Sequence, residues 1–188
     1  NFVVITTKED KKTQEVCSEF NVNCVFSDAF FKNGASFDRG GSINDGLKKL
    51  KYNEWVCHLD CDIALPENFR AAVLLYRLNK NKMWGCQRFI VENESDWREF
   101  LMGKKPHSEF SGPELGGWGC GYFQLWNMRA KALSGVPIET MYPSYPTSGE
   151  SDILMLKRFH PDVDSVGKLN TVVAHLGNVG STHDMSDK

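Results

Sequence analysis

The sequence lacks a large excess of charge of either sign, since 22 Lys and Arg against 24 Asp and Glu leave a net charge of −2 over 188 residues. Proteins that bind nucleic acid tightly carry a marked positive excess, so a nucleic-acid partner is possible but not favoured. No apolar run approaches the length of a membrane span, and no secretory signal pattern opens the chain. We therefore expect no membrane span. Because the chain begins with Asn1, a trimmed terminus stays open.

The six cysteines lack the spacing of a zinc site, because none of them forms a CxxC pair. Several lie inside apolar, strand-like runs, where a thiol packs as a small hydrophobic group. This usage favours a reducing compartment, and we expect a cytoplasmic location. The even number leaves disulfides open.

Apolar runs rich in β-branched and aromatic residues alternate with helical segments along the chain. The expected strands cover 2–5, 23–26, 55–59, 84–91, 120–126 and 171–174. A first helix is expected to end near Phe20, and the further expected helices cover 42–51, 67–80, 95–102, 128–133 and 148–159. This alternation predicts an α/β fold with a mostly parallel central sheet flanked by helices. In such sheets, ligands bind beyond the carboxyl ends of the strands.

The most informative motif is Asp60-Cys61-Asp62, which directly follows the apolar run Trp55–Leu59. Two carboxylates one residue apart at the end of a buried strand offer hard oxygen ligands, which suit Mg²⁺ or Mn²⁺ carrying a diphosphate. The same spacing also arises by chance in solvated loops, so the rest of the chain must support the assignment.

Six further segments accompany this motif in the order found in one family of enzymes. They are Thr6-Thr7, Asp28, the stretch 37–46 that contains Arg39, the stretch 116–128 that begins Gly-Gly-Trp118, and Gly149-Glu150-Ser151-Asp152 with Arg158, followed by His175-Leu176-Gly177. In this order, the chain resembles glycosyltransferases of the GT-A fold, close to the inverting family-2-like nucleotide-sugar transferases. The resemblance covers most of the chain, and it implies a Rossmann-like, mostly parallel sheet with a smaller mixed sheet region on the acceptor side.

The resemblance implies a single domain over 1–188, with a nucleotide-sugar half over about 1–91 and an acceptor half over about 92–188. It assigns Thr6, Thr7, Asp28, Arg39, Asp60 and Trp118 to the donor, and Asp60, Asp62 and His175 to a Mn²⁺ or Mg²⁺ ion. The implied donor is a nucleoside diphosphate sugar, most readily a UDP-sugar. The implied acceptor is a hydroxyl, by default that of a glycan. The segment 103–119 is a candidate lid over the site.

The resemblance also implies a carboxylate base for a hexosyltransferase-type reaction that inverts the anomeric carbon. The spacing to Arg158 favours Asp152, but Ser151 stands where an acidic residue is more common, so Glu150 stays an alternative. An acidic residue in a first helical turn is also favoured simply by the helix dipole. Three other functions stay open, namely a retaining transferase, a nucleotidyltransferase and an inactive transferase-like binding module.

Overall fold

The computed structural model describes residues 1–51, 54–110, 121–147, 150–160 and 166–177. The chain divides into two compact units, one made of 1–56 with 127–161 and the other of 57–126 with 162–188. Each unit takes segments from both of the halves expected from the sequence, and the single domain stays a prediction.

The first unit contains a two-stranded parallel sheet of β1 (Val3–Thr6) and β2 (Asn23–Phe26), joined by α1 (Lys11–Glu19). A short 3-10 helix, η1 (Ala29–Gly34), leads to α2 (Arg39–Lys49), which packs on β1. Two strands alone are marginally stable in water, so the helices must supply the missing apolar cover. Gly46 permits this packing, because a Cβ there would overlap the side chain of Ile5.

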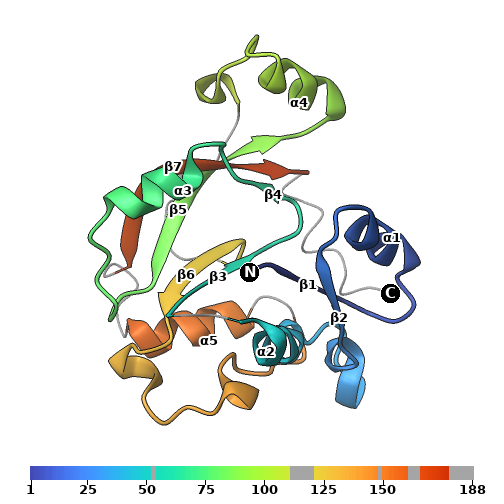
Figure 1. The fold of residues 1–188 in the computed structure, drawn as a ribbon, viewed down its shortest axis with the longest axis vertical. Helices are drawn as coiled ribbons and strands as arrows, with labels where there is room; N and C mark the ends of the chain where they lie inside the picture. The colour runs from blue at the N-terminus through green and yellow to red at the C-terminus, as the bar shows by residue number, and fades with distance from the viewer. Residues whose placement is uncertain (52–53, 111–120, 148–149, 161–165, 178–188) are drawn as a thin grey trace. The chain divides into compact units, whose positions relative to one another are not determined.

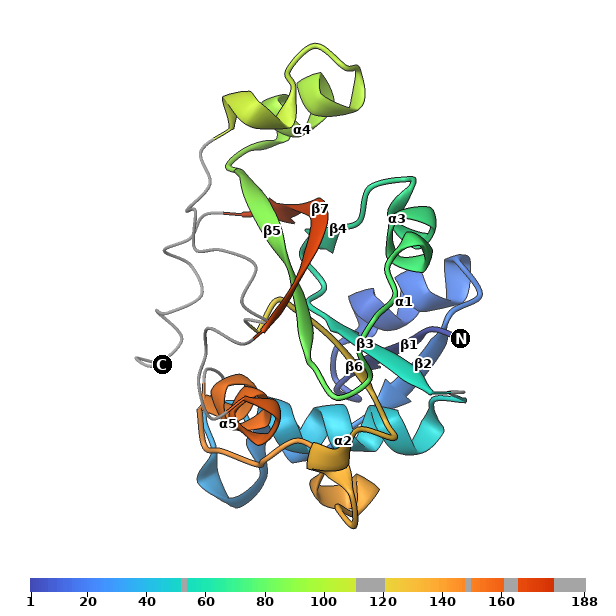
Figure 2. The same cartoon turned by 90° about the vertical axis from the view of Figure 1, so that its left-hand side faces the viewer.

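The rest of the first unit consists of η3 (Lys131–Leu133), η4 (Ile138–Thr140) and α5 (Glu150–Phe159). Helices α2 and α5 lie side by side, as the two views in Figures 1 and 2 agree. Asn44 of α2 is joined to Tyr142, which follows η4, by a reciprocal pair of hydrogen bonds. Its amide donates to the Tyr142 carbonyl at 2.9 Å and accepts from the Tyr142 amide at 2.8 Å.

The second unit contains a mixed sheet of five strands in the order β3-β6-β5-β7-β4. The strands are β3 (Trp55–Leu59), β4 (Ile63–Ala64), β5 (Trp84–Val91), β6 (Phe123–Asn127) and β7 (Gly167–Leu176). Figure 2 shows β5 and β7 side by side, and these two strands run parallel. The pairs β5–β6 and β4–β7 run antiparallel. Two helices, α3 (Phe69–Leu75) and α4 (Glu94–Leu101), and the 3-10 helix η2 (His107–Glu109) complete this unit.

This topology corrects the predicted fold class. The expected GT-A architecture needs one mostly parallel Rossmann-like sheet, whereas the described strands form a small parallel pair and a separate mixed sheet. Most of the expected strands and helices do form near their predicted positions. The prediction was wrong because strand–helix alternation was taken to imply parallel neighbours, while β5 pairs antiparallel with β6, the next strand along the chain.

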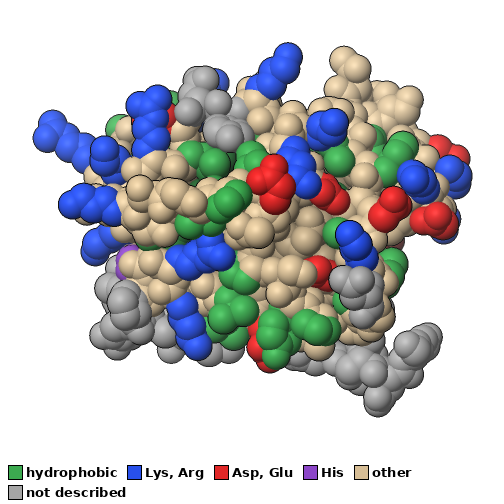
Figure 3. Space-filling model, turned by 90° about the horizontal axis from the view of Figure 1, so that it is seen from below, with side chains coloured by type: hydrophobic (Ala, Val, Ile, Leu, Met, Phe, Trp, Pro, Cys, Tyr) green, Lys and Arg blue, Asp and Glu red, His purple; other side chains and the backbone are tan. Residues whose placement is uncertain are grey.

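Among the described residues, no helix is both long enough and apolar enough to cross a membrane. Seen from below in Figure 3, Lys and Arg side chains predominate on the left of the face, whereas the acidic side chains lie mainly at its centre and right.

Candidate functional site

The pairing of β4 with β7 brings two of the predicted metal ligands together. Ile63 lies opposite His175 in this antiparallel ladder, and the Leu176 amide donates to the Asp62 carbonyl at 2.7 Å. As a result, Nε2 of His175 lies 3.1 Å from Oδ2 of Asp62. His175 is buried with 4% of its side chain exposed, whereas the Asp62 side chain is 35% exposed. The His175 side of the pair is thus fixed inside the protein, and the Asp62 side is open to solvent.

Asp60 lies closest to a different histidine. Its Oδ1 is 3.6 Å from Nε2 of His58, and its amide is held by the Tyr122 carbonyl at 3.0 Å. The His58 side chain is only 12% exposed. Within the described ranges, no three His, Cys, Asp or Glu side chains form a group that could hold a metal ion.

Arg88 of β5 joins the Asp62–His175 pair, and sequence reasoning missed it. Its Nη1 lies 3.4 Å from Nδ1 of His175, and its guanidinium lies 4.5 Å above the centre of the Tyr122 ring. The Tyr122 hydroxyl donates to the Cys86 carbonyl at 2.6 Å, so this ring is fixed in place. The available signal was a single cation inside the apolar run Trp84–Val91, because a charge in such a strand needs a specific partner.

The donor set of Asp62 and His175 fits a divalent ion in type and spacing. Two neighbouring ligands of an octahedral ion at about 2.1 Å are about 3.0 Å apart, close to the observed carboxylate–imidazole separation. Mg²⁺ and Mn²⁺ sites commonly use one or two protein ligands and take the rest from phosphate and water. The contact of Arg88 with His175 determines which ring nitrogen of His175 carries the proton, and a protonated nitrogen cannot bind the ion. A guanidinium only donates, so Nδ1 accepts and the neutral ring carries its proton on Nε2, which faces Asp62.

The first unit contains the predicted base. Nη1 of Arg39, at the first position of α2, lies 2.7 Å from Oδ2 of Asp152 in α5, and their side chains are only 15% and 7% exposed. Burial raises the pKa of Asp152 from 3.8 to about 6, and the nearby Arg39 charge opposes this rise. A carboxylate with such a pKa is close to the range that suits a general base near neutral pH. Arg39, expected to contact the donor, is engaged with this carboxylate.

Asp38 determines where α2 begins and therefore where Arg39 lies. Its side chain caps the helix by accepting from the Gly41 amide at 2.8 Å, and it also accepts from the Ser144 hydroxyl and the Tyr145 amide. Gly40 is required next to it, because a Cβ there would overlap the Pro143 carbonyl. The helix was expected to start at Ser42, whose hydroxyl instead donates to the Arg39 carbonyl inside the helix.

Glu150, the alternative base, is exposed in the first turn of α5. A hydrogen bond to Glu150 raises the pKa of Tyr145, so the carboxylate and the phenol interact at the surface. Glu150 therefore differs from Asp152 in being open to solvent.

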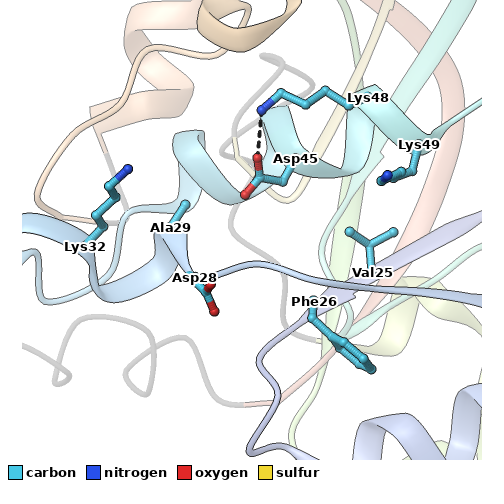
Figure 4. A pocket seen from close by; sticks show the side chains of 8 residues that line it. All are labelled: Val25, Phe26, Asp28, Ala29, Lys32, Asp45, Lys48 and Lys49. Carbon is cyan, nitrogen blue, oxygen red and sulfur yellow. Dashed lines mark hydrogen bonds and ion pairs between the residues drawn. The ribbon is translucent and has the colours of Figure 1, made fainter.

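Of the remaining donor residues, Thr6, Thr7 and Asp28 lie in the first unit. The Thr6 hydroxyl donates to Asp10 at 2.8 Å, and the Thr7 carbonyl accepts from Gln14 at 3.1 Å, so both serve to anchor α1. Asp28 is 84% exposed on its side chain and lies 3.7 Å from Lys8. It lines an open hollow beside β2 and α2, drawn in Figure 4. Trp118 and most of the candidate lid lie outside the described residues.

The structure thus brings Asp62 close to His175, and Arg39 close to Asp152. Among the described residues, Asp60, Asp62 and His175 do not form a group of three metal ligands. No protein-family model matches the chain, and no curated protein or solved structure matches it either. The roles assigned to these residues stay predictions.

Proposed function

We propose that the chain transfers a sugar from a nucleoside diphosphate sugar to an acceptor hydroxyl and depends on a divalent metal ion. The observation that carries this proposal is the 3.1 Å contact between Asp62 and His175, two residues 113 positions apart that were assigned as ligands of the same ion. Their chemistry is that of a Mn²⁺ or Mg²⁺ site completed by phosphate oxygens. The proposal takes no support from the overall topology.

In this reaction, the bond between the anomeric carbon and the diphosphate breaks, and the acceptor oxygen forms the new bond to that carbon. Asp62 and His175 would hold the divalent ion, which would supply positive charge to neutralise the departing diphosphate. For the proton of the attacking hydroxyl, the first unit offers Asp152 as a base, because the raised pKa from burial makes it a stronger base than an exposed aspartate. Arg39 stabilises the ionised form of Asp152 before transfer. An attack from the opposite face inverts the configuration.

Glu150 is the second candidate for the base, because its side chain is exposed while that of Asp152 is only 7% exposed. An acceptor could reach Glu150 without any rearrangement of α5. Asp152 instead requires the acceptor to enter beside Arg39. Comparison of Asp152→Asn with Glu150→Gln therefore separates the two assignments.

The test begins with calorimetric titration of UDP, GDP and CMP, each with and without Mn²⁺. We expect a Mn²⁺-dependent response to one of these nucleotides, and its loss in Asp62→Ala. Glu94→Gln is the matched control, because Glu94 is an exposed carboxylate of the same unit that pairs with the exposed Arg98. The responding nucleotide names the donor class for transfer assays. A folded chain that responds to none of the three would overturn the proposal.

Product stereochemistry then tests the reaction course. Proton NMR of the anomeric signal separates inversion from retention, and the same assay applied to Asp152→Asn and Glu150→Gln identifies the base. We expect Asp152→Asn to keep donor binding and to lose transfer by about 10²–10⁴-fold. Metal-dependent nucleotide binding without any transfer would instead point to a binding module.

A further inference from the structure

The hollow beside β2 combines lysines with an apolar wall, and no role has been assigned to this combination. It has a volume of about 570 Å³ and is lined by Val25, Phe26, Asp28, Ala29, Lys32, Asp45, Lys48 and Lys49. These residues come from the end of β2, from η1 and from the second half of α2, all in the first unit. The volume lies within the range of small-molecule sites.

The charges around the hollow are not balanced. Asp45 accepts from the Ser27 hydroxyl at 2.7 Å and from Nζ of Lys48 at 2.9 Å. Burial alone would raise its pKa, but these hydrogen bonds hold the pKa of Asp45 below its usual value, so it is ionised and matched by Lys48. Asp28 lies 3.7 Å from Lys8, outside the hollow. The charge of Lys32 also acts on Asp45, and neither Lys32 nor Lys49 forms a close ion pair within the described part of the chain. The lining therefore carries three lysines against two aspartates, which leaves a positive balance at the hollow.

Figure 4 shows how Lys32 and Lys49 are arranged. Their side chains stand on either side of the Asp45–Lys48 pair, while Phe26 and Asp28 lie across from that pair. The Phe26 ring is 48% exposed, a large fraction for an aromatic side chain at the end of a strand. Aromatic rings stack favourably on the faces of nucleobases, and ammonium groups bind phosphate oxygens through charge-assisted hydrogen bonds.

We propose that this hollow binds a nucleoside phosphate, with the phosphate groups between Lys32 and Lys49 and the base against Phe26. The ligand is a mononucleotide rather than a nucleic acid strand, because the hollow is bounded by one strand end and one helix instead of continuing as a groove of basic residues. The Asp45–Lys48 pair has a supporting role, since it holds α2 against the end of β2 through Ser27. Binding here needs no metal ion, and the proposal does not rest on the sugar transfer proposed above.

The test uses the full chain with EDTA present, so that binding at Asp62 and His175 does not contribute. ADP, UDP and pyrophosphate are titrated separately by calorimetry at about 50 mM and about 200 mM salt. We expect one of the nucleotides to bind more tightly than pyrophosphate and to weaken as salt rises, because exposed charge pairs are screened. The double variant Lys32→Ala/Lys49→Ala should lose roughly tenfold or more in affinity, since each charge-assisted contact is worth about that factor. Phe26→Ala should reduce nucleotide binding and leave pyrophosphate binding unchanged.

The matched control is Lys11→Ala/Lys12→Ala, which removes two exposed lysines of α1 in the same unit and changes the net charge equally. This control should bind nucleotide as the unmodified chain does. Equal losses in the two double variants would overturn the proposal, because general charge would then explain the binding. Absence of nucleotide binding in EDTA, or tighter binding of an oligonucleotide than of either mononucleotide, would also overturn it. The Asp62→Ala variant should keep this metal-free binding even if the metal-dependent site fails.

Discussion

Arg39 and Asp152 form an ion pair with a 2.7 Å contact although 113 residues separate them in the chain. The pair connects the first residue of α2 with the first turn of α5, and both side chains are almost completely buried. An ion pair usually lowers the pKa of the carboxyl group, yet here the pKa of Asp152 is raised, because the loss of solvation outweighs the attraction of Arg39. This balance makes the stability of the protein depend on pH.

The first prediction is that Asp152 makes the unmodified chain lose stability as pH rises from about 4 to about 6. The folded chain keeps the Asp152 proton up to about pH 6, while the unfolded chain releases it near 3.8. The folded state therefore binds more protons in this window, and its advantage is lost as pH rises through the folded pKa. A shift of this size is worth about 3 kcal/mol. Urea unfolding at several pH values should show this slope relative to Asp152→Asn, which cannot titrate. Parallel curves for the two proteins would contradict it.

The second prediction concerns Arg39→Met, which removes the positive partner and keeps much of the side-chain volume. At pH 8 the buried carboxylate is left without its main counter-charge, and we expect a loss of about 3 kcal/mol in unfolding free energy. Near pH 4.5 the carboxyl group is neutral, so the loss should be much smaller. The control is Arg98→Met, since Arg98 and Glu94 form an exposed pair whose removal should matter little at either pH. A loss that is the same at both pH values would show that Arg39 acts by packing alone.

The third prediction is that Asn44→Ala costs about 3 kcal/mol, because it leaves the buried amide and carbonyl of Tyr142 without their hydrogen bonds. Asn44→Asp should also be destabilising, since a carboxylate can accept from the Tyr142 amide but cannot donate to its carbonyl. Asn68→Ala is the control, because Asn68 is exposed and makes no capping hydrogen bond. Thermal and urea unfolding report the difference, and similar values for Asn44→Ala and Asn68→Ala would refute it.

The sequence predicted local structure better than it predicted the pairing of strands. The runs 23–26, 55–59 and 84–91 form strands at those positions, because β-branched and aromatic residues favour the extended backbone wherever they are placed. Which strands pair depends on contacts between distant segments, such as Trp84 with Leu125, and no local pattern encodes these. The prediction of a parallel sheet was wrong because it depended on which strands pair.

The sequence predicted the wrong helix boundaries where tertiary contacts override local preference. Gly40 and Gly41 disfavour a helix, so α2 was expected to begin at Ser42, but Gly40 is needed for the close approach of Pro143. The helix expected over 67–80 stops at Leu75, and the Tyr76 hydroxyl accepts from the Asn170 amide at 2.7 Å. In the candidate site, the acidic motif and His175 were assigned from the sequence, and their roles stay predictions. Arg88 was missed, because its role depends on the register of β5 against β7.

The fourth prediction is that Gly46→Ala destabilises the protein although alanine is the better helix former. Helix propensity favours the change by about 1 kcal/mol, but the new Cβ would overlap Ile5, and such overpacking costs about 1–3 kcal/mol. The same substitution should be less damaging in an Ile5→Val background, which removes the terminal methyl group. A double-mutant cycle of unfolding free energies measures this coupling. Additive effects of the two substitutions would show that Ile5 and residue 46 do not compete for space.

The fifth prediction is that Arg88→Gln strengthens the binding of Mn²⁺. In the present arrangement the guanidinium donates to Nδ1 of His175, so the ring proton lies on Nε2, toward Asp62, where a metal ligand needs a lone pair. A glutamine oxygen can accept from Nδ1–H instead, which frees Nε2, and the substitution also removes a positive charge near the ion. We expect Mn²⁺ affinity, measured by electron paramagnetic resonance with the metal alone, to rise roughly tenfold.

Arg98→Gln, which removes an exposed charge of the same unit, should leave the affinity unchanged. His175→Ala should abolish the gain in the Arg88→Gln background. An unchanged or weaker affinity in Arg88→Gln would mean that the ion does not use Nε2 of His175.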